Sequence, residues 1–138
     1  MSKNKLNSTV LSTSPVLPNN IKNYLIDIDG TITEDVPNED SKRMVTVSPF
    51  SEAIEVINQW HNEGHIITLF TSRTEEVREI TENWLDTWGF KYHNLLMGKP
   101  RGGNYVIIDN HEFKSCHYNN NWESIKKEMD NYTHNYEK

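Results

Sequence analysis

The stretch YLIDIDGT occupies residues 24–31 and carries the most informative pattern in this 138-residue chain. Its first five residues are mostly apolar or β-branched, which predicts a short buried strand, and the Asp29-Gly30 pair is a turn signal that ends it. Asp27 and Asp29 therefore lie at the carboxyl end of the predicted strand. Because the chain is already turning there, the two carboxylates converge on one point from different directions.

Two carboxylates this close repel one another unless a positive charge lies between them. A hard divalent cation, most simply Mg²⁺, prefers such oxygen ligands, and Gly30 lets the backbone bend close to a ligand. The alternative is an Asx-type turn in which the acids only accept hydrogen bonds from backbone amides. Both interpretations are open from these residues alone.

Helical signals flank the stretch on its carboxyl side. A helix is predicted over residues 48–64, with Ser48 as its cap and Gly64 as its end. A second helix opens with a capping box, Ser72 and Glu75, and ends at Gly89. Apolar residues at helical spacing predict the buried face of this second helix; they are Val77, Ile80, Trp84 and Trp88.

Strand signals alternate with these helices at residues 65–70, 92–96 and 104–109, the last being the strongest of the three. Strands separated by helices normally lie parallel, so we expect an α/β domain with a sheet covered on both faces. Ligands bind outside the carboxyl ends of such strands. Thr71 and Asp109 fall at strand ends of this kind, as Asp27 does. A last amphipathic helix is expected around Trp122, Ile125 and Met129.

Three more positions fit a phosphate site. Thr71 and Ser72 lie where a strand meets a helix N-terminus, a place that favours anions, although capping is the alternative role. Lys99 stands in a stiff Gly-Lys-Pro turn, where its charge can reach a carboxylate and a phosphate; the alternative is a solvated lysine. Asp109 is either a metal ligand or a cap.

Composition limits the class of protein. Asp and Glu total 20 against 14 Lys and Arg, a net charge of −6, and no basic run exists, which argues against nucleic-acid binding. No apolar run approaches the roughly 20 residues of a membrane span, and residues 1–20 lack the apolar core of a signal peptide. We expect no membrane partner, a cytoplasmic location and an idle Cys116 thiol. Residues 1–20 are expected to be a flexible leader, and 21–138 one domain with a tail at 113–138 that holds a short helix.

Four short motifs in this order resemble the haloacid dehalogenase (HAD) superfamily of phosphatases. They are Asp-x-Asp-Gly-Thr at 27–31, Thr-Ser-Arg at 71–73, Gly-Lys-Pro at 98–100 and Ile-Ile-Asp at 107–109. The resemblance covers roughly residues 22–114. The segment 88–100 is also similar to small bacterial HAD proteins associated with capsule or lipopolysaccharide sugar biosynthesis. The resemblance implies a three-layer Rossmann-like fold with a central, mostly parallel sheet.

The same resemblance implies roles for individual residues. Asp27 would be the nucleophile that forms an aspartyl-phosphate, and Asp29 the general acid and then the general base. Thr71 and Lys99 would hold the phosphoryl oxygens, and Mg²⁺ would be held by the Asp27 carboxylate, the Asp29 carbonyl and Asp109. Further phosphate or substrate contacts would come from Gly30, Thr31, Ser72 and Arg73.

One position departs from the family pattern. Asn110 follows Asp109 where a second acid is usual, with Glu112 as a substitute nearby; Asn can bind Mg²⁺ through its carbonyl but adds no charge. The 31–48 and 71–99 intervals are too short for a cap domain, so a capless or minimal form is expected. The acidic loop 34–40 is then either a flap or a solvated surface loop.

These observations predict a Mg²⁺-dependent phosphatase of a small phosphorylated metabolite such as a sugar phosphate. The open site suits a homo-oligomer in which a second subunit covers it. The alternative is a noncatalytic or regulatory HAD-like module that keeps an anion site. A phosphatase of protein or nucleic-acid ends is a third reading, which the acidic charge disfavours for nucleic acid.

Overall fold

A three-stranded parallel sheet with strand order β1-β2-β3 organises the fold. The computed structural model describes residues 16–134, so most of the predicted leader lies outside the described residues. The strands are β1 (Asn23–Asp27), β2 (Ile66–Phe70) and β3 (Asn94–Leu96). Asp27 is in register with Phe70, and Phe70 with Leu96, so the three carboxyl ends are level at one edge.

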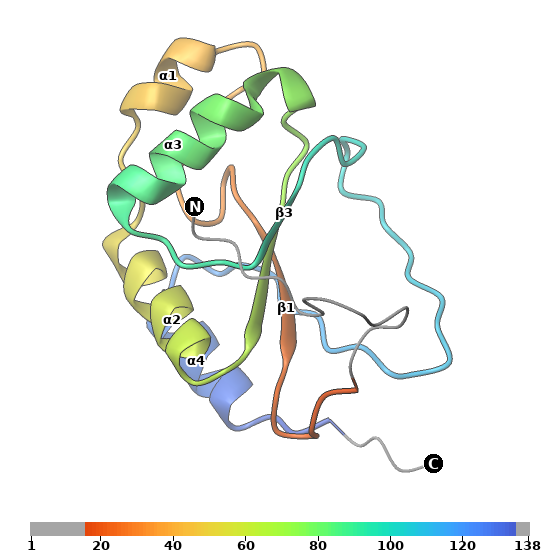
Figure 1. Ribbon diagram of the computed structural model, residues 1–138. Helices are drawn as coiled ribbons and strands as arrows, with labels where there is room; N and C mark the ends of the chain where they lie inside the picture. Colours follow the sequence, from red (N-terminus) through yellow and green to blue (C-terminus); the bar gives the residue numbers. More distant parts are fainter. Residues whose placement is uncertain (1–15, 135–138) are drawn as a thin grey trace, which may run out of the picture.

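Four α-helices and one 3₁₀ helix surround the strands: α1 (Ser41–Thr46), α2 (Ser51–Asn62), the 3₁₀ helix η1 (Glu75–Val77), α3 (Arg78–Trp88) and α4 (Trp122–Asp130). In Figure 1 the α-helices lie to the left of the strands, and the long segment between β3 and α4 runs out to the right. Helix α2 packs against β2 and α4, and α1 packs against α3. The α/β fold class with a parallel sheet is thus confirmed. Within residues 16–134, no helix is long and apolar enough to cross a membrane.

The core lies between the strands and the helices. Its apolar side chains come from all three strands, from the four α-helices and from the loops that join them. The Trp84 indole is 3% exposed and donates to the Val47 carbonyl at 2.7 Å, which ties α3 to the end of α1. The predicted terminal helix is confirmed as α4, and its three predicted apolar residues are buried.

Several local predictions were wrong in detail. Ser48 does not cap α2, whose N-cap is Phe50; the Ser48 carbonyl instead accepts from the Thr33 hydroxyl at 2.9 Å. Ser72 does not begin a helix either, because the chain runs on to η1, whose N-cap is Thr74. Helix α1 was not predicted, since its six residues bury one apolar side chain and leave no periodicity to detect. Trp88 was predicted to lie on the buried face of its helix but is 40% exposed, because it is the last residue of α3.

The predicted strand at 104–109 was also wrong. The segment has no strand partner in the described residues, and Val106, Ile107 and Ile108 are 83%, 64% and 91% exposed. Gly102 and Gly103, both with positive φ, turn the chain before it can run beside the sheet. β-Branched residues favour a strand only where neighbouring backbone offers pairing, and here none lies alongside.

Replacing Ile108 by Asp is therefore expected to change the free energy of unfolding by less than about 0.5 kcal/mol, as exposed substitutions do. The same change at Ile67, which is fully buried in β2, places an unpaired charge in the core and is expected to cost several kcal/mol. Urea denaturation of both variants checks this. A loss of several kcal/mol for Ile108→Asp would show that the segment packs in solution.

Three histidines lie against the sheet and at the end of α2. The His93 Nδ1 accepts from the Ile67 amide at 3.1 Å, and the His65 Nδ1 accepts from the Lys22 amide at 3.0 Å. His61 stacks on His93 with ring centroids 4.5 Å apart. Desolvation lowers the pKa of all three imidazoles; Lys91 adds to the lowering for His61, Lys22 for His65 and His61 for His93.

The folded-state pKa values of these histidines lie below the unfolded value of about 6.5. Their contribution to the free energy of unfolding is therefore fully present above that pH and is lost as the pH falls below it. The unfolded chain then binds protons that the folded chain resists. We expect the melting temperature to be lower at pH 5.5 than at pH 7.5, and the difference to be smaller in His61→Gln. Thermal melts by circular dichroism measure both. An identical pH dependence in the variant would remove His61 from the explanation.

Candidate active site

Asp27 sits at the end of β1 with two donors on its carboxylate. The Lys99 Nζ lies 3.0 Å from Oδ1, and the Thr31 hydroxyl donates to Oδ2 at 3.0 Å. Gly30, at φ 89°, makes the turn that brings Thr31 back, and its amide donates to the Thr33 carbonyl at 2.9 Å. A carboxylate held on both oxygens and one-third exposed is oriented toward solvent and available to a ligand.

Asp29 is held by a different cation. Arg73 donates to it twice, from Nε to Oδ2 at 3.0 Å and from Nη2 to Oδ1 at 2.8 Å. The Arg73 side chain is completely buried, and that of Asp29 is 10% exposed. Each aspartate of the motif thus has its own cationic partner, Lys99 for Asp27 and Arg73 for Asp29.

The backbone of two loops locks this arrangement. Thr71 follows β2, and its amide donates to the Leu96 carbonyl at 2.9 Å, while the Lys99 amide donates to the Thr71 carbonyl at 3.0 Å. The Thr71 hydroxyl accepts from the Arg73 amide at 3.1 Å. The loops after β2 and β3 are therefore fastened together, which places Lys99 beside the end of β1.

A cleft of about 570 Å³ opens over these residues. Asp27, Asp29 and Lys99 form its floor together with Ser72, and the loop after β3 forms one wall. The acidic loop also contributes to the cleft, since Asp35, Val36, Pro37 and Asn38 line it and the Asn38 side chain donates to the Ser72 carbonyl at 3.0 Å. The loop 34–40 is thus a structural part of the cleft.

The Lys99 ammonium lies near two aromatic rings. Its Nζ is 4.9 Å from the centre of the Phe70 ring and 5.7 Å from that of Tyr105. Both distances are within reach of a cation–π attraction. The rings and Asp27 together restrict the ammonium to one position on the floor of the cleft.

The structure brings some predicted residues together and leaves others apart. Asp27, Asp29, Ser72 and Lys99 line the cleft, and Thr31 contacts Asp27. Thr71 and Arg73 are fully buried beneath the floor, so neither presents its side chain to the cleft in this structure. A separate set, Asp109 and Asn110, lies in the exposed segment and does not line the cleft.

Asp109 has other partners. Its Oδ1 accepts from the His111 amide at 2.9 Å, and this bond, with the nearby imidazole, lowers the pKa of the carboxyl. Within residues 16–134, no group of three or more His, Cys, Asp or Glu side chains is placed to hold a metal ion. Mg²⁺, however, is commonly bound by one or two carboxylates together with water and substrate phosphate. The Asp27 carboxylate, together with the backbone carbonyl of Asp29, fits that requirement.

Sequence reasoning missed several residues that support the site. Thr81 accepts from Arg73 Nη1 at 2.9 Å, and the Trp122 indole donates to the Thr31 carbonyl at 2.9 Å. Asn38 and Tyr105 line the cleft walls. Trp122 was predicted only as a core residue, and neither Thr81 nor Asn38 belongs to a recognisable motif. Their roles depend on contacts between distant parts of the chain.

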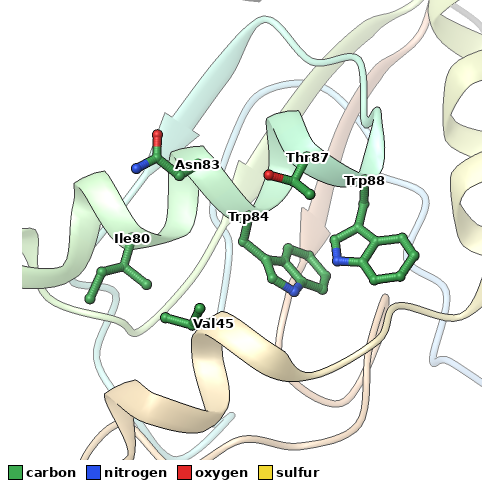
Figure 2. Close-up of a pocket in the computed structure, with 6 residues that line it drawn as sticks. All are labelled: Val45, Ile80, Asn83, Trp84, Thr87 and Trp88. Carbon is green, nitrogen blue, oxygen red and sulfur yellow. The ribbon is translucent and has the colours of Figure 1, made fainter.

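A second pocket, of about 170 Å³, lies between α1 and α3. Figure 2 shows side chains of α3, Ile80, Trp84 and Trp88 among them, facing Val45 of α1. Asn83 and Thr87 are its only polar residues, and no charged side chain lines it. A pocket without charge does not suit phosphate, so the cleft at the strand ends is the candidate site.

Comparisons with known proteins agree with this geometry. A family model described as PITM 1-3, LNS2 domain, matches residues 24–130, and the chain belongs to this family. The LNS2 domain has a HAD-like phosphatase fold, which confirms the superfamily. A search of curated proteins found no match.

Among solved structures, an MCSG target from Vibrio cholerae is 21% identical with a TM-score of 0.50, covering 79% of this chain and 99% of that one. Two structures of the Pnkp1/Rnl/Hen1 complex, one of them called an RNA repair complex, are each 23% identical with a TM-score of 0.51. They cover 88% and 91% of this chain, but the chain spans only 38% and 36% of those proteins. These likenesses show a shared fold.

Proposed function

We propose that this member of the LNS2 domain family is a Mg²⁺-dependent phosphatase that hydrolyses a small phosphorylated metabolite through an aspartyl-phosphate intermediate. The observation that carries the proposal is the floor of the cleft, where the Asp27 carboxylate lies 3.0 Å from the Lys99 ammonium and beside Asp29. A nucleophile, a cation and a second carboxyl group are the parts that phosphoryl transfer requires.

Asp27 is suited to attack phosphorus. The Thr31 hydroxyl and Lys99 fix its carboxylate, so that one oxygen can approach the phosphoryl group without first losing rotational freedom. Lys99 offsets the charge of the phosphoryl oxygens as the new bond forms. Asp29 then gives its proton to the leaving oxygen and later takes one from the water that releases phosphate.

The Asp27 carboxylate and the Asp29 backbone carbonyl would hold the Mg²⁺ ion. When bound, the ion would neutralise part of the charge that keeps one anion from attacking another. Asp109 and Asn110 are proposed to add ligands only if the exposed segment that carries them approaches the cleft. Thr71 is proposed to support the site from below, through the backbone bonds that position Lys99.

A sugar phosphate is the proposed substrate class. The cleft is open, and Asn38, Ser72 and Arg101 offer polar groups around the charged floor, which suits a hydroxyl-rich ester. The similarity of residues 88–100 to capsule-associated HAD proteins supports the same class. An open cleft with no covering domain in residues 16–134 also suits a homo-oligomer in which a second subunit covers it.

The test is phosphate release by the full chain with Mg²⁺ and with EDTA, across three kinds of substrate. Sugar phosphates test the proposed class, phosphatidate tests the relation of the LNS2 domain to phosphatidate phosphatases, and RNA with a 3′-phosphate tests the likeness to the RNA repair complex. We expect metal-dependent turnover with the highest kcat/KM for a sugar phosphate. A preference for phosphatidate or RNA would overturn the substrate class, and no turnover at all would overturn the activity.

A noncatalytic module that binds anions is the second candidate. It is favoured by the exposed position of Asp109, which does not line the cleft. Titration calorimetry with inorganic phosphate, read together with turnover on the substrate panel, separates the two candidates. Binding without turnover of any substrate in the panel favours the module.

A further inference from the structure

We propose that Arg73 is a positioning residue that fixes the plane of the Asp29 carboxylate for proton transfer. This inference rests on the proposed phosphatase function. It replaces the expectation that Arg73 contacts the substrate, because its side chain is fully buried and does not line the cleft.

Three of the five N–H donors of the guanidinium are bonded to protein side chains. Two parallel bonds join it to Asp29, from Nε at 3.0 Å and from Nη2 at 2.8 Å. Nη1 donates to the Thr81 hydroxyl at 2.9 Å, and that hydroxyl donates in turn to the Val77 carbonyl at 2.8 Å. The fork is therefore anchored to α3 on one side and holds the carboxylate on the other.

The backbone of Arg73 is fixed as firmly as its side chain. Its amide donates to the Thr71 hydroxyl at 3.1 Å, and its carbonyl accepts from the Gly98 amide at 2.7 Å. The guanidinium thus has a defined position relative to both the β2 and the β3 loops. Lys99 belongs to the second of these loops, so the cationic partners of both aspartates are held by the same pair of loops.

This geometry leaves part of the Asp29 carboxylate free. Each oxygen accepts one bond from Arg73 and keeps a second lone pair, and the residue still lines the cleft while its side chain is only 10% exposed. A planar two-bond contact prevents the carboxylate from rotating. A lysine at this position would supply a charge without that planar restraint.

The restraint acts on two proton transfers. In the first, an Asp27 oxygen bonds to phosphorus while the bond from phosphorus to the leaving oxygen breaks, and Asp29 gives its proton to that oxygen. In the second, Asp29 takes a proton from water as the water oxygen bonds to phosphorus and the bond to Asp27 breaks. Inorganic phosphate leaves, and Asp29 is protonated again.

The test compares Arg73→Lys with the wild-type full chain on two Mg²⁺-supported substrates. An alkyl phosphate needs its leaving oxygen protonated, whereas 4-nitrophenyl phosphate has a leaving group stable without a proton. We expect kcat/KM, which reports the steps up to the aspartyl-phosphate, to fall about 10- to 100-fold for the alkyl ester. For 4-nitrophenyl phosphate the expected fall is about threefold or less.

Arg78→Gln is the matched control, because Arg78 also pairs with carboxylates, Glu75 and Glu82, but does not contact Asp29. It should leave the ratio of the two kcat/KM values unchanged. If circular dichroism shows that Arg73→Lys does not fold, Thr81→Val removes the anchor of the guanidinium instead and should shift the ratio in the same direction, with Thr81→Ser restoring it.

Equal losses on both substrates in the folded variants would overturn the positioning role and leave Arg73 a structural ion pair. A wild-type chain that releases phosphate from neither substrate would instead overturn the proposed function, so the two failures are distinct.

Discussion

Asp27→Asn is expected to lower Mg²⁺-dependent phosphate release by about 10³-fold or more. The substitution keeps the size of the side chain, and the amide oxygen of asparagine can still accept from the Lys99 ammonium. An amide, however, has no anionic oxygen to attack phosphorus. Removing a nucleophile commonly costs this much or more, because the remaining groups cannot form the covalent intermediate. The measurement is kcat/KM for the best substrate in the panel.

Asp35→Asn is the control for charge. Asp35 lines the same cleft and is exposed, and the substitution removes one negative charge as Asp27→Asn does. Activity within about tenfold of wild type is expected, since no catalytic step has been assigned to it. Retention of full activity by Asp27→Asn would contradict the aspartyl-phosphate mechanism, and a comparable loss in Asp35→Asn would reduce the effect to electrostatics.

Much of the sheet and of the site floor follows from local sequence. The apolar run before Asp27 predicts β1, and the run before Thr71 predicts β2, because a short buried strand needs little beyond its own residues. Parallel strands bring their carboxyl ends to one edge, and the turn that carries Lys99 follows β3 there. The structure places the Lys99 ammonium 3.0 Å from the Asp27 carboxylate.

The rest depends on contacts that a local pattern does not contain. Residues 104–109 carry a strong strand pattern, yet pairing requires a neighbouring strand, and the segment pairs with none in the described residues. Arg73 was expected to contact the substrate, because nothing nearby in sequence shows that its guanidinium bonds to Thr81 and Asp29 instead. Helix α1 is too short to show periodicity, so its Asp40 cap was assigned to a loop.

Trp60→Ala is expected to destabilise the fold by about 3–5 kcal/mol, which is the range for removing a buried tryptophan. Trp60 is 1% exposed and lies where β1, α2 and α4 meet. Its ring stacks on Tyr24 with centroids 4.0 Å apart, and it meets the edge of Trp122 at 6.2 Å. Its indole also donates to Asp130 at 3.1 Å, so the substitution leaves both a cavity and an unpaired acceptor.

Trp88→Ala provides the comparison, because it is the same chemical change at a residue 40% exposed beside the α1–α3 pocket. Less apolar area is lost and solvent can fill the space, so a cost below about 1.5 kcal/mol is expected. Urea denaturation of both variants gives the two free energies of unfolding. Similar costs for the two variants would contradict the difference in burial between Trp60 and Trp88.

A larger cost for Trp60→Ala would also predict weaker activity at 37 °C. Trp60 contacts Trp122, and the Trp122 indole donates to the Thr31 carbonyl in the turn after Asp27.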